Sequence, residues 1–260
     1  MILPKADIVP KETTGGLDSV AVRFPSDPIA QELILAAGGY VAAPSANTSG
    51  RPSPTTAGHV AEDLGEAIDM IIDGGQVNIG LESTIVDFTE EVPVVLRPGY
   101  ISLEMLRETL GDVRMDKGLI KPDSKVHPKA PGMKYRHYAP KADLAIVEGP
   151  DERVIAEIEK RALEAEKNGD TVGIIATDET KDRYSHGIIK SIGSREQEET
   201  IAHHLYEVLR DFDSCNVSAI YSEAFFTPKM GQAIMNRLLK AAGHKIINVE
   251  EEKENDSTGM

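Results

Sequence analysis

The chain has 260 residues, of which 40% are apolar and 27% are charged, and this composition excludes a disordered or fibrous protein. Its 28 basic and 43 acidic residues give a net charge of −15, which disfavours a broad nucleic-acid-binding surface but allows a small anionic substrate held by a few local cations. The single cysteine, Cys215, excludes an internal disulfide, and no apolar run approaches the roughly 18 residues of a membrane span, so we expect a cytoplasmic protein without membrane partners.

The first part of the chain alternates short strand and helix signals, as an α/β fold does. Apolar runs closed by Gly, Asp or Pro predict strands at 19–24, 40–43, 68–72, 83–88 and 92–97. Helices are expected at 28–37, where Pro28 takes the first position, at about 55–64, and after Ser102, whose hydroxyl can cap a helix.

Residues 114–141 reverse the sign of the charge. They hold eight Lys or Arg against two Asp, together with four prolines, and they show no apolar periodicity. Because proline breaks helices and removes backbone donors, we predict a basic, proline-rich linker here. The predicted organisation is a first domain at 1–113, the linker at 114–141, a second domain at 142–250 and a disordered tail at 251–260.

The second domain shows a more regular pattern. Strands are predicted at 143–147, 171–176, 188–192, 219–222 and 246–249. Helices are expected at 151–168, at 230–242 and after Ser194, which forms a capping-box pattern with Gln197. Strands that alternate with helices favour a three-layer, Rossmann-like α/β domain with a mainly parallel sheet.

The loop at 44–54 is the richest candidate site. It follows an apolar run and offers hydroxyls, an amide and a guanidinium with little bulk. Ligands of α/β proteins bind beyond the carboxyl ends of strands, and Ser45 and Asn47 point to the same side of an extended segment. These groups suit phosphate or adenine, whereas the alternative is a plain surface turn, since Ser, Asn, Gly and Pro form turns.

Other strand ends carry further polar groups. Arg23 interrupts an apolar run, so it either binds a buried anion or points to solvent. Arg97 ends another run, and residues 80–84 close with two hydroxyls, which together suit a substrate with carboxylate and phosphate groups. Cations alternate with aromatic rings at 134–140 and suit a lid over a nucleotide, although a solubilising linker has the same composition.

One cluster has metal-ligand spacing. His203 lies four residues from both Glu199 and Glu207, and His204 is its neighbour. A solvated helix face opposite an apolar stripe gives the same pattern, and we prefer that interpretation, with no protein-bound metal.

Four segments, at 13–23, 43–50, 81–87 and 96–99, together resemble the ordered motifs of the threonylcarbamoyl-AMP synthase family, which has a YrdC-like domain. The His-Tyr-Ala-Pro segment at 137–140, followed by a Rossmann-like domain, resembles the long, two-domain form. The resemblance covers nearly the whole chain. It implies a partial YrdC-like α/β synthase domain followed by a Rossmann-like three-layer α/β accessory domain.

The resemblance also implies an activity. L-threonine, bicarbonate and ATP would give threonylcarbamoyl-AMP and pyrophosphate, and a tRNA threonylcarbamoyl transferase complex would use the product. Magnesium would arrive with ATP, and no tightly bound cofactor is implied. Carried over by motif, Arg23, Ala43 and Ser83 would bind L-threonine. The residues implied for ATP are Ser19, Ser45, Asn47, Ser53 and Arg97. Tyr138 would reach into the site from the linker.

The sequence departs from the family pattern at its start. Family members carry a further segment of roughly a hundred residues, most of a domain, before the first of these motifs, with a Lys-x-Arg motif for the ATP phosphates. No Lys-x-Arg precedes Arg23. We therefore expect the second half of the synthase domain here, with three explanations open: a truncated sequence, a split enzyme completed by a separate chain, or a non-catalytic nucleotide- or partner-binding relative.

Overall fold

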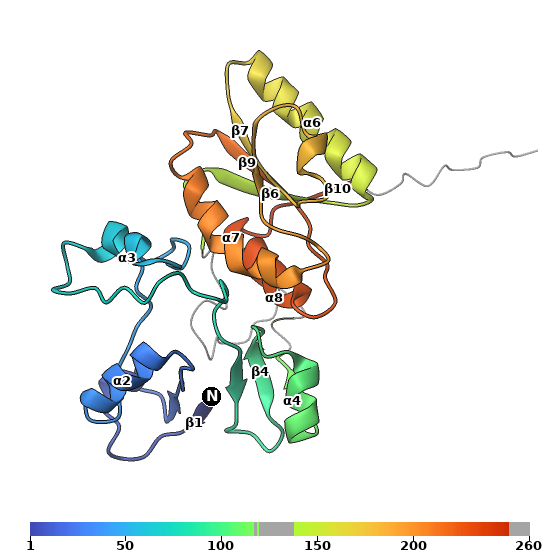
Figure 1. The fold of residues 1–260 in the computed structure, drawn as a ribbon. Helices are drawn as coiled ribbons and strands as arrows, with labels where there is room; N and C mark the ends of the chain where they lie inside the picture. Colours follow the sequence, from blue (N-terminus) through green and yellow to red (C-terminus); the bar gives the residue numbers. More distant parts are fainter. Residues whose placement is uncertain (117–118, 120–137, 250–260) are drawn as a thin grey trace, which may run out of the picture.

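The computed structural model describes residues 1–116, 119 and 138–249 (Figure 1). These residues form two five-stranded sheets. We call residues 1–116, around the first sheet, the first unit, and residues 138–249, around the second sheet, the second unit. The predicted tail and most of the predicted linker lie outside the described residues. No helix of the described residues has the length and apolar character to cross a bilayer.

The first sheet is mixed and has the order β2-β1-β3-β4-β5. Its strands are β1 (Ile2–Pro4), β2 (Ser19–Ala21), β3 (Ile85–Asp87), β4 (Val94–Arg97) and β5 (Arg114–Met115). Strand β1 is antiparallel to β2 and parallel to β3, and β4 is antiparallel to β3 and parallel to β5. Two small apolar clusters, one around Leu96 and one around Val95, pack on the sheet, so this unit has only a modest core.

Four short helices accompany the first sheet. They are α1 (Lys11–Thr14), α2 (Pro28–Ala36), α3 (Ala57–Leu64) and α4 (Leu103–Leu110). Side chains of Asp27, Thr56 and Ser102 cap α2, α3 and α4 by accepting a backbone amide three residues on, as predicted for Ser102. None of the four helices contains a buried residue.

Two predicted strands do not form. Residues 40–43 and 68–72 adopt no regular structure, and Tyr40 and Met70 are exposed. The strand predicted at 19–24 ends at Ala21. A strand persists only where a neighbouring strand takes up its backbone hydrogen bonds, and no strand of the described residues pairs with these segments. Apolar composition is therefore not sufficient to define a strand here.

The second sheet is entirely parallel and has the order β10-β6-β9-β7-β8. Its strands are β6 (Asp143–Glu148), β7 (Val172–Ala176), β8 (Ile188–Ser191), β9 (Ala219–Glu223) and β10 (Ile246–Asn248). All five were predicted within two residues. Consecutive side chains alternate between the two faces: Ile146 packs in one apolar cluster and Val147 in the other.

Helices cover both faces of this sheet, which confirms the three-layer architecture. Helix α6 (Asp151–Lys167) packs on one face, and α7 (Glu198–Phe212) and α8 (Gly231–Ala241) pack on the other. A single 3-10 turn, η1 (Lys181–Arg183), follows β7. The capping box predicted from Ser194 is wrong: α7 begins at Glu198, and its N-cap residue, Gln197, makes no side-chain cap.

Helices α7 and α8 lie between the second sheet and the first unit (Figure 1). Their apolar faces, with Leu205 and Leu238 fully buried, pack on the sheet. Each fully buried aliphatic side chain contributes about 1.5–3 kcal/mol, so this face holds the helices firmly. Their polar side chains are therefore presented to the first unit from a rigid support.

Candidate functional site

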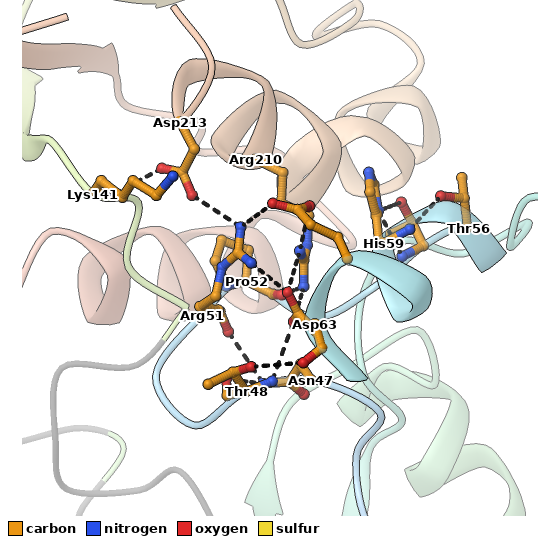
Figure 2. Close-up of polar contacts among 12 residues, drawn as sticks. Asn47, Thr48, Arg51, Pro52, Thr56, His59, Asp63, Lys141, Arg210 and Asp213 are labelled. Carbon is orange, nitrogen blue, oxygen red and sulfur yellow. Dashed lines mark hydrogen bonds and ion pairs between the residues drawn. The ribbon is translucent and has the colours of Figure 1, made fainter. Parts of the chain in front are cut away.

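The loop at 44–54 is anchored by the carboxylate of Asp63, near the end of α3 (Figure 2). The Asp63 side chain is fully buried, and it accepts hydrogen bonds from Arg51 of the loop. Arg210 of α7 also donates to it, at 2.7 and 3.1 Å, and the amide of Thr48 donates at 3.2 Å. The Asp63 carboxylate therefore connects the loop to α3 in the first unit and to α7 in the second unit.

Arg210 and Arg51 each have a second acceptor in the first unit. Arg210 donates to the carbonyl of Pro52 at 2.6 Å, and Arg51 pairs with Glu62 at 2.9 Å. The hydrogen bond from Arg210 lowers the pKa of Asp63, and the one from Arg51 lowers the pKa of Glu62. Both carboxylates are therefore charged at neutral pH, and the loop is held by charge-assisted hydrogen bonds.

Two loop residues of the predicted ATP site differ in their surroundings. Ser45 is exposed. Asn47 is partly buried, and its Nδ2 donates to the carbonyls of Thr48 and Arg51 at 2.9 and 3.4 Å. Its Oδ1 is buried and accepts no hydrogen bond from the described residues. Asn47 therefore keeps one unused acceptor in the loop.

A second cluster surrounds Glu82, which precedes β3. Its carboxylate accepts hydrogen bonds from Ser53 Oγ at 2.8 Å, from the Tyr206 hydroxyl of α7 at 2.7 Å and from Arg237 Nε of α8 at 3.0 Å. Burial acts to raise the pKa of Glu82, but the charge of Arg237 and these hydrogen bonds outweigh it and lower the pKa to about 2. Glu82 is therefore a permanently charged junction between the loop and the second unit.

Arg237 joins the Glu82 segment to the end of β4. Its side chain is 1% exposed, and it donates to the carbonyls of Glu82, at 3.2 Å, and of Pro98. The Arg237 guanidinium is buried away from water, and the Glu82 carboxylate together with the two carbonyls accepts its hydrogen bonds. The second unit therefore fixes the spacing of two motif segments of the first unit.

Arg97 and Ser83 are in direct contact. Arg97 donates from Nε and Nη2 to the Ser83 carbonyl at 3.1 and 3.0 Å, whereas Ser83 as a whole is exposed. Gly99 permits this approach, because a Cβ there would lie 2.4 Å from the amide nitrogen of Thr84 and 2.6 Å from the Glu82 carbonyl oxygen. The glycine of the 96–99 segment is therefore required by backbone contact.

Tyr138 lies where the second unit begins and is 3% exposed. Its backbone has a φ of 65°, and its ring packs against Tyr206 with centroids 5.1 Å apart. Burial, and then the charge of Glu82, raise the pKa of Tyr138 to about 12, so its hydroxyl stays protonated and donates to Glu82. The following amide, of Ala139, donates to the Gly50 carbonyl at 3.0 Å, which ties the loop to this segment.

The remaining predicted residues lie elsewhere. Ser19 is in β2 opposite Pro4, and Arg23 is exposed two residues beyond the end of that strand. Ala43 is exposed as well. Of the two alternatives for Arg23, the structure therefore shows the exposed one. Among the described residues, no hydrogen bond or ion pair links these positions to the Glu82 cluster.

Sequence reasoning missed Glu82, Tyr206 and Arg237 as members of this cluster. Glu82 had the strongest signal, because it lies within a motif segment next to Ser83. Tyr206 and Arg237 lie on amphipathic helices of the second unit, where a polar residue among apolar ones is the only clue. Their partner is more than a hundred residues away in the chain.

The histidines of α7 have structural partners. One ligand atom each of His203, His204 and Glu207 lies within 4.8 Å of the others, while Glu199 is not part of the group. His203 and His204 contact the backbone carbonyls of Asn78 and Ile192 at 3.1 and 3.2 Å through Nδ1. Gln76 Nε2 donates to Glu207 at 3.0 Å. These contacts give the group a role in joining 76–78 to α7 that needs no metal.

Known proteins resemble both units. The family description "Threonylcarbamoyl-AMP synthase, C-terminal domain" matches residues 101–243, and "Telomere recombination" matches residues 1–99. The threonylcarbamoyl-AMP synthase of Bacillus subtilis is 47% identical over 248 residues, which are 95% of this chain and 70% of that protein. The Pyrococcus abyssi synthase is 44% identical over 96% of this chain and 71% of its own length.

The solved structures agree with the sequence comparison. The crystal structure of P. abyssi Sua5 complexed with L-threonine superposes with a TM-score of 0.86 at 43% identity, over 95% of this chain and 71% of that one. The match therefore extends over both units. The chain belongs to the threonylcarbamoyl-AMP synthase family.

Proposed function

We propose that this chain converts L-threonine, bicarbonate and ATP into threonylcarbamoyl-AMP and pyrophosphate. One observation carries the proposal: Ser53, Arg97 and Tyr138, implied as substrate contacts from three separate segments, gather around Glu82. The family membership names the reaction, and this convergence supports a polar site at the same place. The P. abyssi relative was crystallised with L-threonine, which supports threonine as the amino acid substrate.

The proposed roles follow the chemistry of each side chain. Arg23 is exposed and can pair with the threonine carboxylate, with Ala43 and Ser83 beside the amino acid. The proposed ATP and adenylate contacts are Ser19, Ser45, Asn47, Ser53 and Arg97. The unused Oδ1 of Asn47 can accept a hydrogen bond from the amino group of adenine. Tyr138 closes the site from the linker side.

The proposed chemistry requires positioning rather than a protein nucleophile. The threonine nitrogen bonds to the carbon of bicarbonate, a C–O bond of bicarbonate breaks and water leaves, which gives the carbamate. A carbamate oxygen then attacks the α-phosphorus of ATP. The bond between the α-phosphorus and the bridging oxygen breaks, and pyrophosphate leaves with both bonding electrons. Cations near the phosphates stabilise the charge that develops there, and Mg²⁺ enters as part of the ATP complex without a tightly bound cofactor.

The partners are proposed from the same reaction. A tRNA threonylcarbamoyl transferase complex consumes the product, and the reaction takes place in the cytoplasm, where these substrates and tRNA are found. On helix α2, the side chains of Ile29, Leu33 and Leu35 are 44%, 51% and 67% exposed. This apolar surface supports the proposal that a separate chain packs against α2. We keep the division into a synthase part at 1–113, a linker at 114–141 and an accessory domain at 142–250 as a proposal.

Pyrophosphate release by the purified chain tests the proposal. We expect release from ATP only when both L-threonine and bicarbonate are present, together with a product of the mass of threonylcarbamoyl-AMP. Arg23→Gln should raise the KM for L-threonine more than the KM for ATP. Release that is indifferent to threonine or bicarbonate, or its absence from a folded chain, contradicts the proposal for this chain.

A further inference from the structure

Three side chains of α7 bring two imidazoles and a carboxylate together. One ligand atom each of His203, His204 and Glu207 lies within 4.8 Å of the others. All three residues are half-buried, so a small ion can reach them from solvent. The ligand atoms around a tetrahedral metal ion lie about 3.4 Å apart, a separation that small rotations of these side chains can reach. The group therefore has the dimensions of a metal site.

Both imidazole rings are held so that one nitrogen stays free. His203 Nδ1 lies 3.1 Å from the carbonyl oxygen of Asn78, and His204 Nδ1 lies 3.2 Å from that of Ile192. A carbonyl oxygen only accepts hydrogen bonds, so Nδ1 carries the proton in each ring, and Nε2 of a neutral imidazole then has a lone pair. Histidines that bind metals are oriented in this way, with the other ring nitrogen donating to a carbonyl or a carboxylate.

The carboxylate and the backbone around it are also held in place. Gln76 Nε2 donates to Oε2 of Glu207 at 3.0 Å. A Cβ on Gly80 would lie 2.2 Å from the carbonyl oxygen of His203, so the segment at 76–80 packs directly on the backbone of α7. Because these supports already exist, little ordering is needed when an ion binds.

A solvated face of α7, the interpretation that the sequence favours, would leave the three side chains free to turn. The structure shows that each has a polar partner outside α7: the carbonyl of Asn78, the carbonyl of Ile192 and the amide of Gln76. These contacts join 76–78 to α7 with or without an ion. The convergence of the three ligand atoms is a separate feature, which the joining role does not require.

We propose that His203, His204 and Glu207 bind a divalent transition metal ion such as Zn²⁺. Two imidazole nitrogens favour such an ion over Mg²⁺ and Ca²⁺, which prefer oxygen ligands. Three protein ligands leave one position of a tetrahedral ion for water. The ion has no part in the proposed reaction. It stabilises the contact of 76–78, in the first unit, with α7, in the second.

Calorimetric titration of the full chain with Zn²⁺ at neutral pH tests the inference without any turnover. We expect wild type to bind a single equivalent. His203→Asn should weaken binding at least about 100-fold, because the asparagine amide can donate to the Asn78 carbonyl but supplies no ring nitrogen. His244→Asn is the matched control and should bind like wild type. His244 is exposed and has a φ of 63°, a conformation that asparagine tolerates well.

Two further variants keep the test independent of the folding of His203→Asn. Glu207→Gln retains an acceptor for Gln76 but loses the charge, and it should show a similar loss of affinity. Gln76→Leu keeps all three ligands and should weaken Zn²⁺ binding about 10-fold, because Glu207 loses the amide that orients it. Zn²⁺ should raise the thermal unfolding midpoint of wild type and of His244→Asn, but not that of Glu207→Gln.

Binding that follows these variants upholds the inference, whether or not the chain makes threonylcarbamoyl-AMP. Wild-type chain that binds no stoichiometric Zn²⁺ overturns it. If His203→Asn and Glu207→Gln bind Zn²⁺ as wild type does, or if His244→Asn loses as much affinity as they do, the chain holds an adventitious ion only and the inference is wrong.

Discussion

Glu82 concentrates polar contacts from four segments on one carboxylate, and its charge state follows from its partners. Ser53, Tyr206 and Arg237 donate to it, and Tyr138 lies beside it. Removing one member of a buried ion pair leaves the other without compensation, which costs more than the pair contributes. The stability of this cluster should therefore change even when one carboxylate oxygen of Glu82 is replaced.

We expect Glu82→Gln to lower the free energy of unfolding by about 3 kcal/mol, because Arg237 keeps its burial and loses its counter-charge. Urea titration followed by far-UV circular dichroism measures the change. Glu152→Gln is the control, since Glu152 pairs with Arg183 at the surface with 79% and 41% of the two side chains exposed. That variant should unfold at the same urea concentration as wild type. Equal effects of the two substitutions contradict the assigned role.

At the residue scale, local composition pointed to the segments that hold Ser53, Arg97 and Tyr138, and the family resemblance pointed to these residues themselves. Neither pointed to the other members of the cluster. Ser53, Arg97 and Tyr138 stand in segments whose polar residues interrupt a recognisable pattern. The partner of a buried charge is set by tertiary packing, so nothing near Arg237 in the chain indicates Glu82. Arg23 shows the converse, because an arginine in an apolar run proved to be exposed once its strand ended at Ala21.

At the scale of the elements, one close backbone contact sets how the segment after β4 packs against the segment before β3. A Cβ on Gly99 would lie 2.4 Å from the Thr84 amide nitrogen. We expect Gly99→Ala to cost about 1–3 kcal/mol, since the backbone must shift to remove the overlap. Gly58→Ala in α3 is the control: its Cβ would meet nothing closer than 3.6 Å, and alanine favours a helix by up to about 1 kcal/mol.

Thermal unfolding of both glycine variants measures the contrast. The midpoint should fall for Gly99→Ala and stay equal or rise for Gly58→Ala. Because the shift at Gly99 displaces Glu82 and Ser83, the KM for L-threonine should also rise in that variant alone. A fall of similar size in both variants contradicts the close contact.

Helix α7 holds the loop at 44–54 mainly through Arg210, which donates to both Asp63 and the Pro52 carbonyl. We expect Arg210→Met to speed amide hydrogen exchange in residues 47–63 by about 30-fold, the result of a local opening energy lower by about 2 kcal/mol. Asp211→Asn is the matched control, since Asp211 faces Lys190 instead of the loop. Unchanged exchange in Arg210→Met contradicts the anchoring role.

Element prediction succeeded where the pattern and the partners agree. The inner strands of the second sheet, β6, β9 and above all β7, are largely buried, and the apolar runs of all five strands have neighbours to pair with. Residues 40–43 and 68–72 have comparable apolar runs and no strand beside them among the described residues. Whether an apolar run forms a strand therefore depends on its hydrogen-bond partners, which a single sequence does not show.

At the scale of the whole molecule, the two units are joined by carboxylates of the first and guanidinium groups of the second. Glu82 pairs with Arg237, and Asp63 pairs with Arg210. The pKa of each of these carboxyls is lowered in the folded chain. Because such a group binds its proton more weakly when folded, its stabilising contribution is present above its ordinary pKa and is lost as the pH falls toward the folded value.

The junction between the units should therefore weaken in acid. For Glu82, a pKa lowered from 4.5 to about 2 corresponds to a contribution of about 3 kcal/mol at neutral pH. The difference in unfolding free energy between wild type and Glu82→Gln should shrink from that size at pH 7 toward zero near pH 2, with most of the loss between pH 4.5 and 2. Urea titrations of both proteins at a series of pH values measure it. A difference that stays constant with pH would mean that packing, and not the Glu82 charge, joins the two units.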